Sequence, residues 1–403
     1  MVYKNFISGL ENHLKSFNID RIISFLLSII TLEDGSNLFR ILEAKTTSKK
    51  ASSKKLTELK PRLPHSIYYY VDNSTSYQNE IEYLISNIQA KVCIKFVKNK
   101  ILITDRGINF LSTSNDSDIQ LDNDPSKPTN IYLKVSDSNN KQLLPFFIGM
   151  ALGMIPEITR YDRDKYVKVN LKNVKSSFMK YYKKENERKN YFGSFDYGSV
   201  MILDNRFGGK YNKTTYTFKF YSYYNPPVYS LYGLIRSFTF NDYRRLNYMY
   251  CKNDCPHLLG CNSHGYPNGD CSSCVCGPHF LYPSCQMYPV HNNPSCGIKT
   301  MYTAYSKKLY LTRKNVTGNC YCRIKSSTGR KVAITVNSME SSSTYYLFNV
   351  LDIYYRSDRA VTPLRLRHIH SNLVIPPLYK EVYLVFHDMF SPTNFSIMYY
   401  NSK

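Results

Sequence analysis

Apolar residues recur at helical spacing in two segments of the chain. Ile81, Leu84, Ile85 and Ile88 lie three or four residues apart, which predicts an amphipathic helix that ends at about Lys91. A second and more apolar helix is predicted from Leu143 to Met154. The side of it that we expect to be buried comprises Leu143, Phe147, Met150, Ala151 and Met154.

Short β-rich segments surround these helices. Residues 63–71 and 92–97 are predicted strands before the second helix, and residues 331–336 and 382–386 are predicted strands near the end of the chain. Between Lys98 and Lys141 the chain is polar and rich in Asp, Asn and Ser. The pattern therefore predicts a mixed α and β region first and a β-rich region last.

The first sixty residues have a different pattern of apolar and polar positions. Ile22 to Leu32 is an apolar run whose length suits the core of a signal peptide, although Phe6, Leu10, Leu14 and Phe17 before it also fit one face of an amphipathic helix. The Lys- and Ser-rich stretch of residues 45–60 is predicted to be a flexible linker or the remnant of a pro-segment. No other run is long enough to be a transmembrane helix, so no transmembrane anchor is expected.

Length and charge limit the classes of partner. A chain of 403 residues is long enough for two or three domains with their own cores. The formal charge of +23 favours polyanionic partners such as glycosaminoglycans, although Lys- and Asn-rich codon usage would produce the same excess. No signature of a nucleic-acid-binding module is present, so nucleic acid is not an expected partner.

The cysteines indicate the compartment. Ten of the eleven lie between Cys251 and Cys322, a density that predicts disulfides in an oxidising environment and a secreted, extracellular protein. His257, His264 and His279 interleave with them, so a zinc knuckle is the alternative, which we place behind disulfides. Asn-x-Ser/Thr triplets are compatible with secretion as glycosylation sites; they begin at Asn73, Asn115, Asn212, Asn315 and Asn394.

The chain lacks the side chains that most hydrolytic sites need. There is no histidine between His65 and His257 and no cysteine between Cys93 and Cys251, whereas a catalytic zinc ion takes three protein ligands that usually include histidine. No Gly-x-Ser-x-Gly motif is present either. The residues therefore predict no zinc cofactor and no serine or cysteine nucleophile.

Several segments nevertheless resemble the astacin family of secreted zinc peptidases. The sequence Arg160-Tyr-Asp162-Arg163-Asp164-Lys-Tyr166-Val167 is similar to the family's R-x-D-R-D-x-Y-V segment. Residues 195–201 (FDYGSVM) resemble the family's Met-turn, which lies beneath the zinc site, with Met201 as its methionine. Residues 92–96 resemble a family strand that includes a cysteine, and residues 232–251 resemble the family's terminal helix and cysteine.

The resemblance implies the positions of a zinc site. It also implies that the zinc-binding and catalytic side chains are absent from these positions. The family helix reads H-E-x-x-H-x-x-G-x-x-H-E, so alignment on Gly153 and Glu157 assigns the histidine positions to Phe146, Met150 and Pro156. The position of the catalytic Glu holds Phe147, and that of the tyrosine after the Met-turn holds Leu203. Glu157, which in the family pairs with the mature amino terminus, is expected to cap or to pair with a neighbouring arginine. The family frame is otherwise retained at Gly153, Glu157, Arg160, Asp162, Arg163, Asp164 and Tyr166.

Two further resemblances complete the predicted architecture. Residues 252–286 resemble an EGF-like module and residues 294–403 resemble a CUB domain, an order similar to the nematode branch of the family. The expected fold is thus α+β, with a signal or pro region and linker (1–60), a two-lobed metzincin domain (61–251), a disulfide-rich module and a β-sandwich. The resemblance implies the disulfides Cys93–Cys251, Cys255–Cys271, Cys261–Cys274, Cys276–Cys285 and Cys296–Cys320. Cys322 would have no partner in this pairing and would be either buried or available for an intermolecular bond.

Three hypotheses of function follow. The first is a secreted, catalytically inactive pseudoprotease that acts as an interaction module for extracellular proteins or polyanionic glycans. The second is an active zinc metalloendopeptidase, as membership of the family alone would imply. The third is a decayed product without a selected role. The side chains at the ligand positions favour the first hypothesis over the second.

Overall fold

The computed structural model describes residues 57–402 except 187–188, 220–236, 256–259, 262–263, 278, 282, 292, 342–349 and 368–369. All described residues belong to one unit, Leu56–Lys403. The predicted apolar run, most of the predicted linker, His257 and the start of the predicted terminal segment lie outside them. Within the described part of the chain, no helix has the length and apolar character that crossing a membrane requires.

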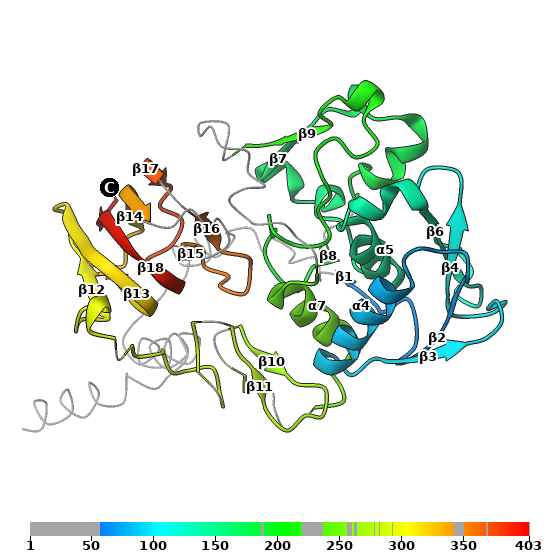
Figure 1. The fold of residues 1–403 in the computed structure, drawn as a ribbon, viewed down its shortest axis with the longest axis horizontal. Helices are drawn as coiled ribbons and strands as arrows, with labels where there is room; N and C mark the ends of the chain where they lie inside the picture. Colours follow the sequence, from blue (N-terminus) through cyan, green and yellow to red (C-terminus); the bar gives the residue numbers. More distant parts are fainter. Residues whose placement is uncertain are drawn as a thin grey trace, which may run out of the picture. The chain divides into compact units, whose positions relative to one another are not determined.

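A five-stranded sheet forms one side of the first part of the chain (Figure 1). Its strand order is β3-β2-β4-β6-β5; β5 is antiparallel to β6, and the other pairs are parallel. In β6 the residues alternate between buried and half-buried, which is the pattern of a strand with one covered face. The strands are β2 (Ser66–Val71), β3 (Lys95–Asn99), β4 (Ile108–Thr113), β5 (Asp118–Gln120) and β6 (Thr129–Lys134).

Helix α4 (Gln78–Lys91) follows the predicted pattern. Its Ile81, Leu84, Ile85 and Ile88 are all buried. The N–H of Val92 still donates to the carbonyl of Ile88, so the helical hydrogen bonding reaches this residue. Strand β3 therefore starts at Lys95, and the prediction of a strand from residue 92 was wrong by three residues.

Helix α5 (Leu143–Ala151) is shorter than predicted. Gly153 has a φ of +94°, a left-handed conformation that glycine adopts without strain and that ends the helix before Met154. Four of the five residues expected on the buried side are buried, whereas Met150 is half-buried. A Cβ at Gly149 would lie 2.5 Å from Sδ of Met201, so α5 sits directly against this methionine because residue 149 has no side chain.

Helix α7 (Phe240–Tyr250) closes the first part of the chain. It begins with a capping box in which Thr239 accepts from the N–H of Asp242 and the Asp242 carboxylate accepts from the N–H of Thr239. Its end is tied to the sheet by Cys93–Cys251, which joins residues 158 positions apart. Two further strand pairs lie in this part: β1 (Thr57–Glu58) with β8 (Lys189–Asn190), and β7 (Val167–Val169) with β9 (Tyr216–Phe218).

The cysteine-rich segment contains the pairs that the resemblance implies. Cys255–Cys271, Cys261–Cys274 and Cys276–Cys285 surround the short hairpin of β10 (Tyr266–Pro267) and β11 (Cys274–Val275), and Cys296–Cys320 follows. The thiols of this segment are therefore disulfides rather than ligands of a zinc knuckle. Cys322 is free and buried, and burial raises the pKa of its thiol to about 12.

The last part of the chain is a seven-stranded β structure with antiparallel and parallel pairs. The first half of β18 pairs with β15 and its second half pairs with β14, while β13 accompanies β18 along both halves through several register shifts. Phe386 and Phe395, one from each half of β18, stack with their centroids 4.3 Å apart. The strands are β12 (Met301–Ala304), β13 (Leu309–Ser326), β14 (Val332–Ser341), β15 (Val350–Tyr354), β16 (Leu364–Arg367), β17 (His370–Ile375) and β18 (Glu381–Asn401).

Candidate functional site

The positions that the resemblance assigns to zinc ligands lie on α5 and in the turn after it. Phe146 and Phe147 are 2% and 0% exposed, and their ring centroids lie 5.7 Å apart. Pro156 is buried and Met150 is half-buried. None of these side chains carries nitrogen or oxygen, so they offer no ligand that zinc prefers.

Two rings from later in the sequence, Tyr181 and Phe207, pack against these phenylalanines, and a third ring, Phe178, packs against Tyr181 and Phe207. Phe178 and Tyr181 come from η5 (Ser176–Tyr181), and Phe207 lies in the turn after the Met-turn. The Tyr181 ring lies 5.8 Å from that of Phe146 and 6.3 Å from that of Phe147, and the Phe207 ring lies 5.3 Å from that of Tyr181. We call Phe146, Phe147, Phe178, Tyr181 and Phe207 the aromatic cluster. Aromatic side chains therefore occupy the space above α5.

Segment η5 also covers the edge of the sheet. The N–H of Ile119, in edge strand β5, donates to the Tyr181 hydroxyl at 3.4 Å, and Nζ of Lys180 donates to the Ile119 carbonyl at 2.9 Å. The Tyr181 hydroxyl donates to Asp118, and Lys180 lies 2.8 Å from the other oxygen of that carboxylate. Burial and then the bond to Asp118 raise the pKa of Tyr181. An extended peptide therefore finds the main-chain groups of Ile119 already bonded to the chain itself.

This arrangement predicts a local effect of removing one hydroxyl. Tyr181→Phe leaves the N–H of Ile119 without a protein partner, and we expect a loss of about 1 kcal/mol in the free energy that protects this amide. Hydrogen exchange measures it: exchange of Ile119 should accelerate while that of Ile131 on β6 stays unchanged. Tyr83→Phe, at a residue that is 60% exposed, is the control. Unchanged exchange at Ile119 in the Tyr181 variant would contradict the covered edge.

The Met-turn lies beneath α5 as the resemblance implies. Met201 is fully buried, and the next two residues, Ile202 and Leu203, are 2% and 5% exposed. The carbonyl of Leu203 accepts from the hydroxyl of Tyr216, whereas its side chain has no group that could polarise a carbonyl. Asp242 supports the turn by accepting from Ser199 and Val200, and burial raises the pKa of Asp242 to about 6.

Glu157 is paired with two arginines. Its side chain is fully buried; one carboxylate oxygen pairs with Arg245 of α7, and the other lies 3.3 Å from Nη1 of Arg160. Arg160 also binds Asp162 through two hydrogen bonds of 2.8 and 2.9 Å. Burial acts to lower the pKa of Arg245, but Glu157 and the nearby aspartates outweigh it and raise the pKa. The expectation that Glu157 pairs with an arginine agrees with these contacts, and both carboxylate oxygens face a guanidinium.

The rest of the retained frame is structural. The Arg163 guanidinium donates to the carbonyls of Ile158 and Tyr182, and so joins two turns of the chain. Asp164 pairs with Lys184 at 2.6 Å. The Tyr166 ring stacks on Phe195 with centroids 4.6 Å apart. These contacts hold the segment after α5 in place.

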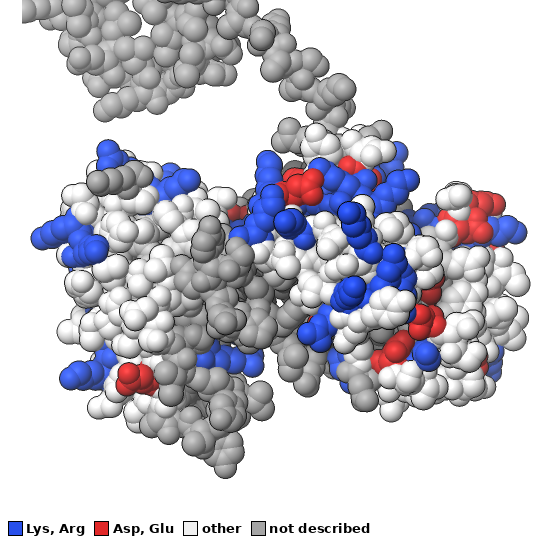
Figure 2. Space-filling view, turned by 90° about the horizontal axis from the view of Figure 1, so that it is seen from above, with Lys and Arg blue, Asp and Glu red and all other residues white. Residues whose placement is uncertain are grey.

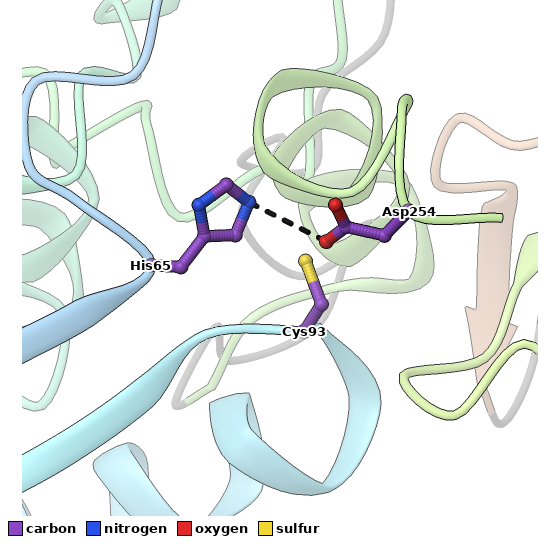
Figure 3. Close-up of side chains that lie close together, drawn as sticks. All are labelled: His65, Cys93 and Asp254. Atoms are coloured by element: carbon purple, nitrogen blue, oxygen red, sulfur yellow. Dashed lines mark ion pairs between the residues drawn. The ribbon is translucent and has the colours of Figure 1, made fainter.

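The described residues contain one group of three side chains close enough to hold a metal ion, and it does not fit zinc. Figure 3 shows His65, Cys93 and Asp254 facing one another. The sulfur of Cys93 is bonded to that of Cys251, so it cannot be a thiolate ligand. Nε2 of His65 lies 2.6 Å from the carbonyl of Tyr250 and 3.4 Å from the Asp254 carboxylate. Neither this group nor the aromatic cluster therefore has the donor set of a catalytic zinc site.

A groove of about 730 Å³ lies beside the aromatic cluster. Met150 and Pro156 form part of its floor, together with Leu121 and Met154. Its charged lining is mostly basic and consists of Lys60, Arg62, Lys180, Lys183, Lys184 and Lys189, against Glu58 and Glu185. The cleft between the expected lobes is thus closed over α5 but open next to it.

Sequence reasoning missed the residues that close the site. Tyr181, Phe207 and Lys180 lie outside every motif on which the resemblance rests. Arg245 is 88 residues from Glu157, so its role could not be assigned from spacing. The alternation of residues 129–134 could have indicated β6, a strand within the polar stretch for which we predicted none, and β6 pairs with the edge strand β5.

Comparison with known proteins identifies relatives of this part of the chain. Residues 57–251 match the sequence model of Astacin, a family of peptidases. Zinc metalloproteinases nas-34, nas-27 and nas-17 of Caenorhabditis elegans are 29%, 27% and 25% identical over 208, 227 and 344 residues. These matches cover 50%, 51% and 78% of this chain but 33%, 52% and 72% of the relatives. The chain thus spans a third of the first relative and about half of the second.

Solved structures give matches of low overall similarity. High choriolytic enzyme 1, a hatching enzyme zinc-protease from Oryzias latipes, is 22% identical and covers 50% of this chain and 98% of its own, with a TM-score of 0.38. The CUB1-EGF-CUB2 domain of human MASP-1/3 is 14% identical and covers 38% and 56%, with a TM-score of 0.21.

Proposed function

Because residues 57–251 belong to the astacin family of peptidases, we propose that this chain is a secreted member whose peptidase site is catalytically silent and which acts by binding extracellular partners. The observation that carries this proposal is the aromatic cluster. Phe146 and Phe147 occupy positions where the family places a zinc-binding histidine and the general base, and Tyr181 and Phe207 fill the space in front of them.

The chemistry of zinc peptidases explains why this substitution silences the site. Such an enzyme needs an ion that acidifies a water molecule, a base that takes its proton and room for the peptide carbonyl. Phenylalanine rings supply neither ligand nor base, and a water molecule among them would lack polar partners. The bonded edge of β5 removes the main-chain groups along which an extended substrate would pair.

Secretion and the modular architecture belong to the same proposal. The five disulfides are stable in an oxidising compartment, and the five candidate glycosylation asparagines are all exposed. The proposed domains are the degenerate peptidase domain (61–251), an EGF-like module (252–286) and a CUB-like domain (294–403). With the peptidase site filled, exposed surfaces such as the basic groove and the two small domains remain for partners.

Metal content and proteolysis test the proposal on one sample. Secreted full-length protein should contain less than about a tenth of an equivalent of zinc, whereas a catalytic site holds one ion. It should also show no cleavage of denatured protein substrates that a chelator abolishes. A catalytically active astacin-family protein, secreted and assayed in parallel, is the positive control. Near-stoichiometric zinc with chelator-sensitive cleavage would establish the alternative, an active metalloendopeptidase with other ligands.

A further inference from the structure

Two segments next to the filled site form a surface with positive charge only. Residues 167–175 and 206–219 contain no Asp or Glu. We call this surface the lysine platform; its basic residues are Lys168, Lys172, Lys175, Arg206, Lys210, Lys213 and Lys219. All seven are exposed. Figure 2 looks onto the part of the molecule that carries β7 and β9, and Lys and Arg side chains gather there.

The platform is held together by its own backbone. Strands β7 and β9 pair across it, and the N–H of Asn170 donates to the carbonyl of Thr215 at 2.7 Å. The side chain of Asn173 donates to the Thr214 carbonyl at 2.6 Å, and Nζ of Lys210 donates to the Lys172 carbonyl at 3.1 Å. The basic side chains are therefore fixed near one another on a paired scaffold rather than scattered along a loose loop.

Most of these charges have no counter-charge among the described residues. Lys175 lies 3.7 Å from Asp116, a long ion pair. Across the part of the chain that the structure describes, no carboxylate comes within ion-pair distance of five other members of the platform: Lys168, Lys172, Arg206, Lys210 and Lys213. Several like charges on one rigid surface create a positive potential that a polyanion lowers.

An exposed tyrosine lies between two of these lysines in the sequence. Tyr211 is 92% exposed, and Tyr211 and Asn212 both have a positive φ, of 52° and 57°. Two successive residues other than glycine in this conformation are strained, and such strain is concentrated at sites that bind. The turn thus holds a phenol ring in solvent between Lys210 and Lys213. A ring in this position offers an apolar face to a sugar while the ammonium groups on either side meet its anionic substituents.

We propose that the lysine platform is a binding site for a sulfated polysaccharide. Six of the seven basic residues are lysines, which attract anionic groups as point charges without fixing the orientation of each group. The platform carries its charges on the exposed sides of paired segments, which suits a long polyanion with regularly spaced sulfates. This inference rests on the proposed function only for the extracellular setting, since neither the seven basic residues of the platform nor Tyr211 belong to the aromatic cluster or line the basic groove.

Matched charge variants test the proposal in the full-length secreted protein. One variant combines Lys168→Gln, Lys172→Gln, Lys210→Gln and Lys213→Gln. The control combines Lys307→Gln, Lys308→Gln, Lys325→Gln and Lys331→Gln, four exposed lysines of the last domain, so both variants lose the same formal charge. With heparin as the probe at physiological salt, we expect the platform variant to bind about tenfold or more weakly, with a shallower dependence on salt, and the control to stay within about twofold.

Three further measurements sharpen the result. Tyr211→Ser should weaken heparin binding with no change of charge. Thr214→Ala removes the glycosylation triplet at Asn212 without changing a strained residue, and it should preserve or strengthen binding. Heparin stripped of its sulfates should not bind. An equal loss in the two charge variants would overturn the proposal, as would equally tight binding of the wild type to phosphatidylserine vesicles or polyglutamate. None of these outcomes bears on zinc or proteolysis, so either proposal can be rejected without affecting the other.

Discussion

Glu157→Gln should destabilise the first domain more than any other single conservative change in the frame. The substitution keeps the shape of the side chain but removes the charge that faces Arg245 and Arg160. The guanidinium of Arg245 is 6% exposed and would remain as a buried cation with only Asp242 and Asp196 nearby. Removing one partner of a buried ion pair costs about 3–5 kcal/mol because the other charge stays buried without a counter-charge. We expect the free energy of unfolding to fall by this amount.

Hydrogen exchange of amides in α5 and α7 measures this loss within the full chain. A local method is needed because a chain of several domains does not unfold in a single two-state transition. Glu82→Gln is the control, because Glu82 pairs with Lys98 on the surface and both side chains are about half exposed. That change should cost less than about 1 kcal/mol. Similar small losses in both variants would mean that the Glu157 pair contributes no more than a surface pair.

A double-mutant cycle separates the pair from its surroundings. Arg245→Met should cost about as much as Glu157→Gln, because it leaves the carboxylate with Arg160 alone. The two changes together should cost less than the sum, with a coupling of about 1–3 kcal/mol for residues in contact. Strict additivity would show that the two side chains do not stabilise each other.

Some features of the fold were predicted from local spacing and others from the resemblance. The helix around Ile81 and Ile88 and the disulfide framework follow from spacing or from the resemblance, and the structure contains both. Boundaries were less accurate because they depend on backbone conformation. A left-handed Gly153 ends α5 early, and the helical hydrogen bond of Val92 delays β3.

For the candidate site, the sequence predicted only that zinc-binding side chains are absent from the family positions. The residue types at Phe146 and Phe147 already exclude zinc ligation at those positions, whatever their surroundings. What packs around these positions is a tertiary property. Tyr181 and Phe207 reach α5 from irregular segments, where no periodicity marks which ring faces the core. The same holds for the pairing of Arg245 with Glu157 across 88 residues.

The packing of apolar side chains would let the frame persist without an ion, as the proposed function requires. In a metal site, buried polar ligands are satisfied by the ion, and losing it would leave each unsatisfied group at a cost of about 1–3 kcal/mol. Here Phe146 and Phe147 are apolar and pack against one another, while Arg160 and Arg163 of the frame donate hydrogen bonds to other groups of the protein. We therefore expect the ion pairs around Glu157 and the Cys93–Cys251 disulfide to stabilise this fold.

Removal of the Cys93–Cys251 disulfide should be the second large effect. We expect Cys93→Ala with Cys251→Ala to lower the stability of the first domain by about 4–5 kcal/mol, because the bond closes a loop of 158 residues and the chain-entropy model gives that magnitude. The bond joins the chain just before β3 to the end of α7, so β3 to β6, α5 and the Met-turn lie within the loop, whereas β2 and α4 precede it. Exchange of amides in α4 and α7 should accelerate together.

The Cys276–Cys285 bond is the control, since it closes a loop of only nine residues outside this domain. Its removal should leave exchange in α4 and α7 unchanged, while the short hairpin near it loses protection. If removal of Cys93–Cys251 left α4 as protected as in the wild type, packing of the aromatic cluster and the Glu157 pair would suffice to hold the domain. The long loop would then already be restricted in the unfolded chain, because the entropic effect of a crosslink depends on the freedom that it removes.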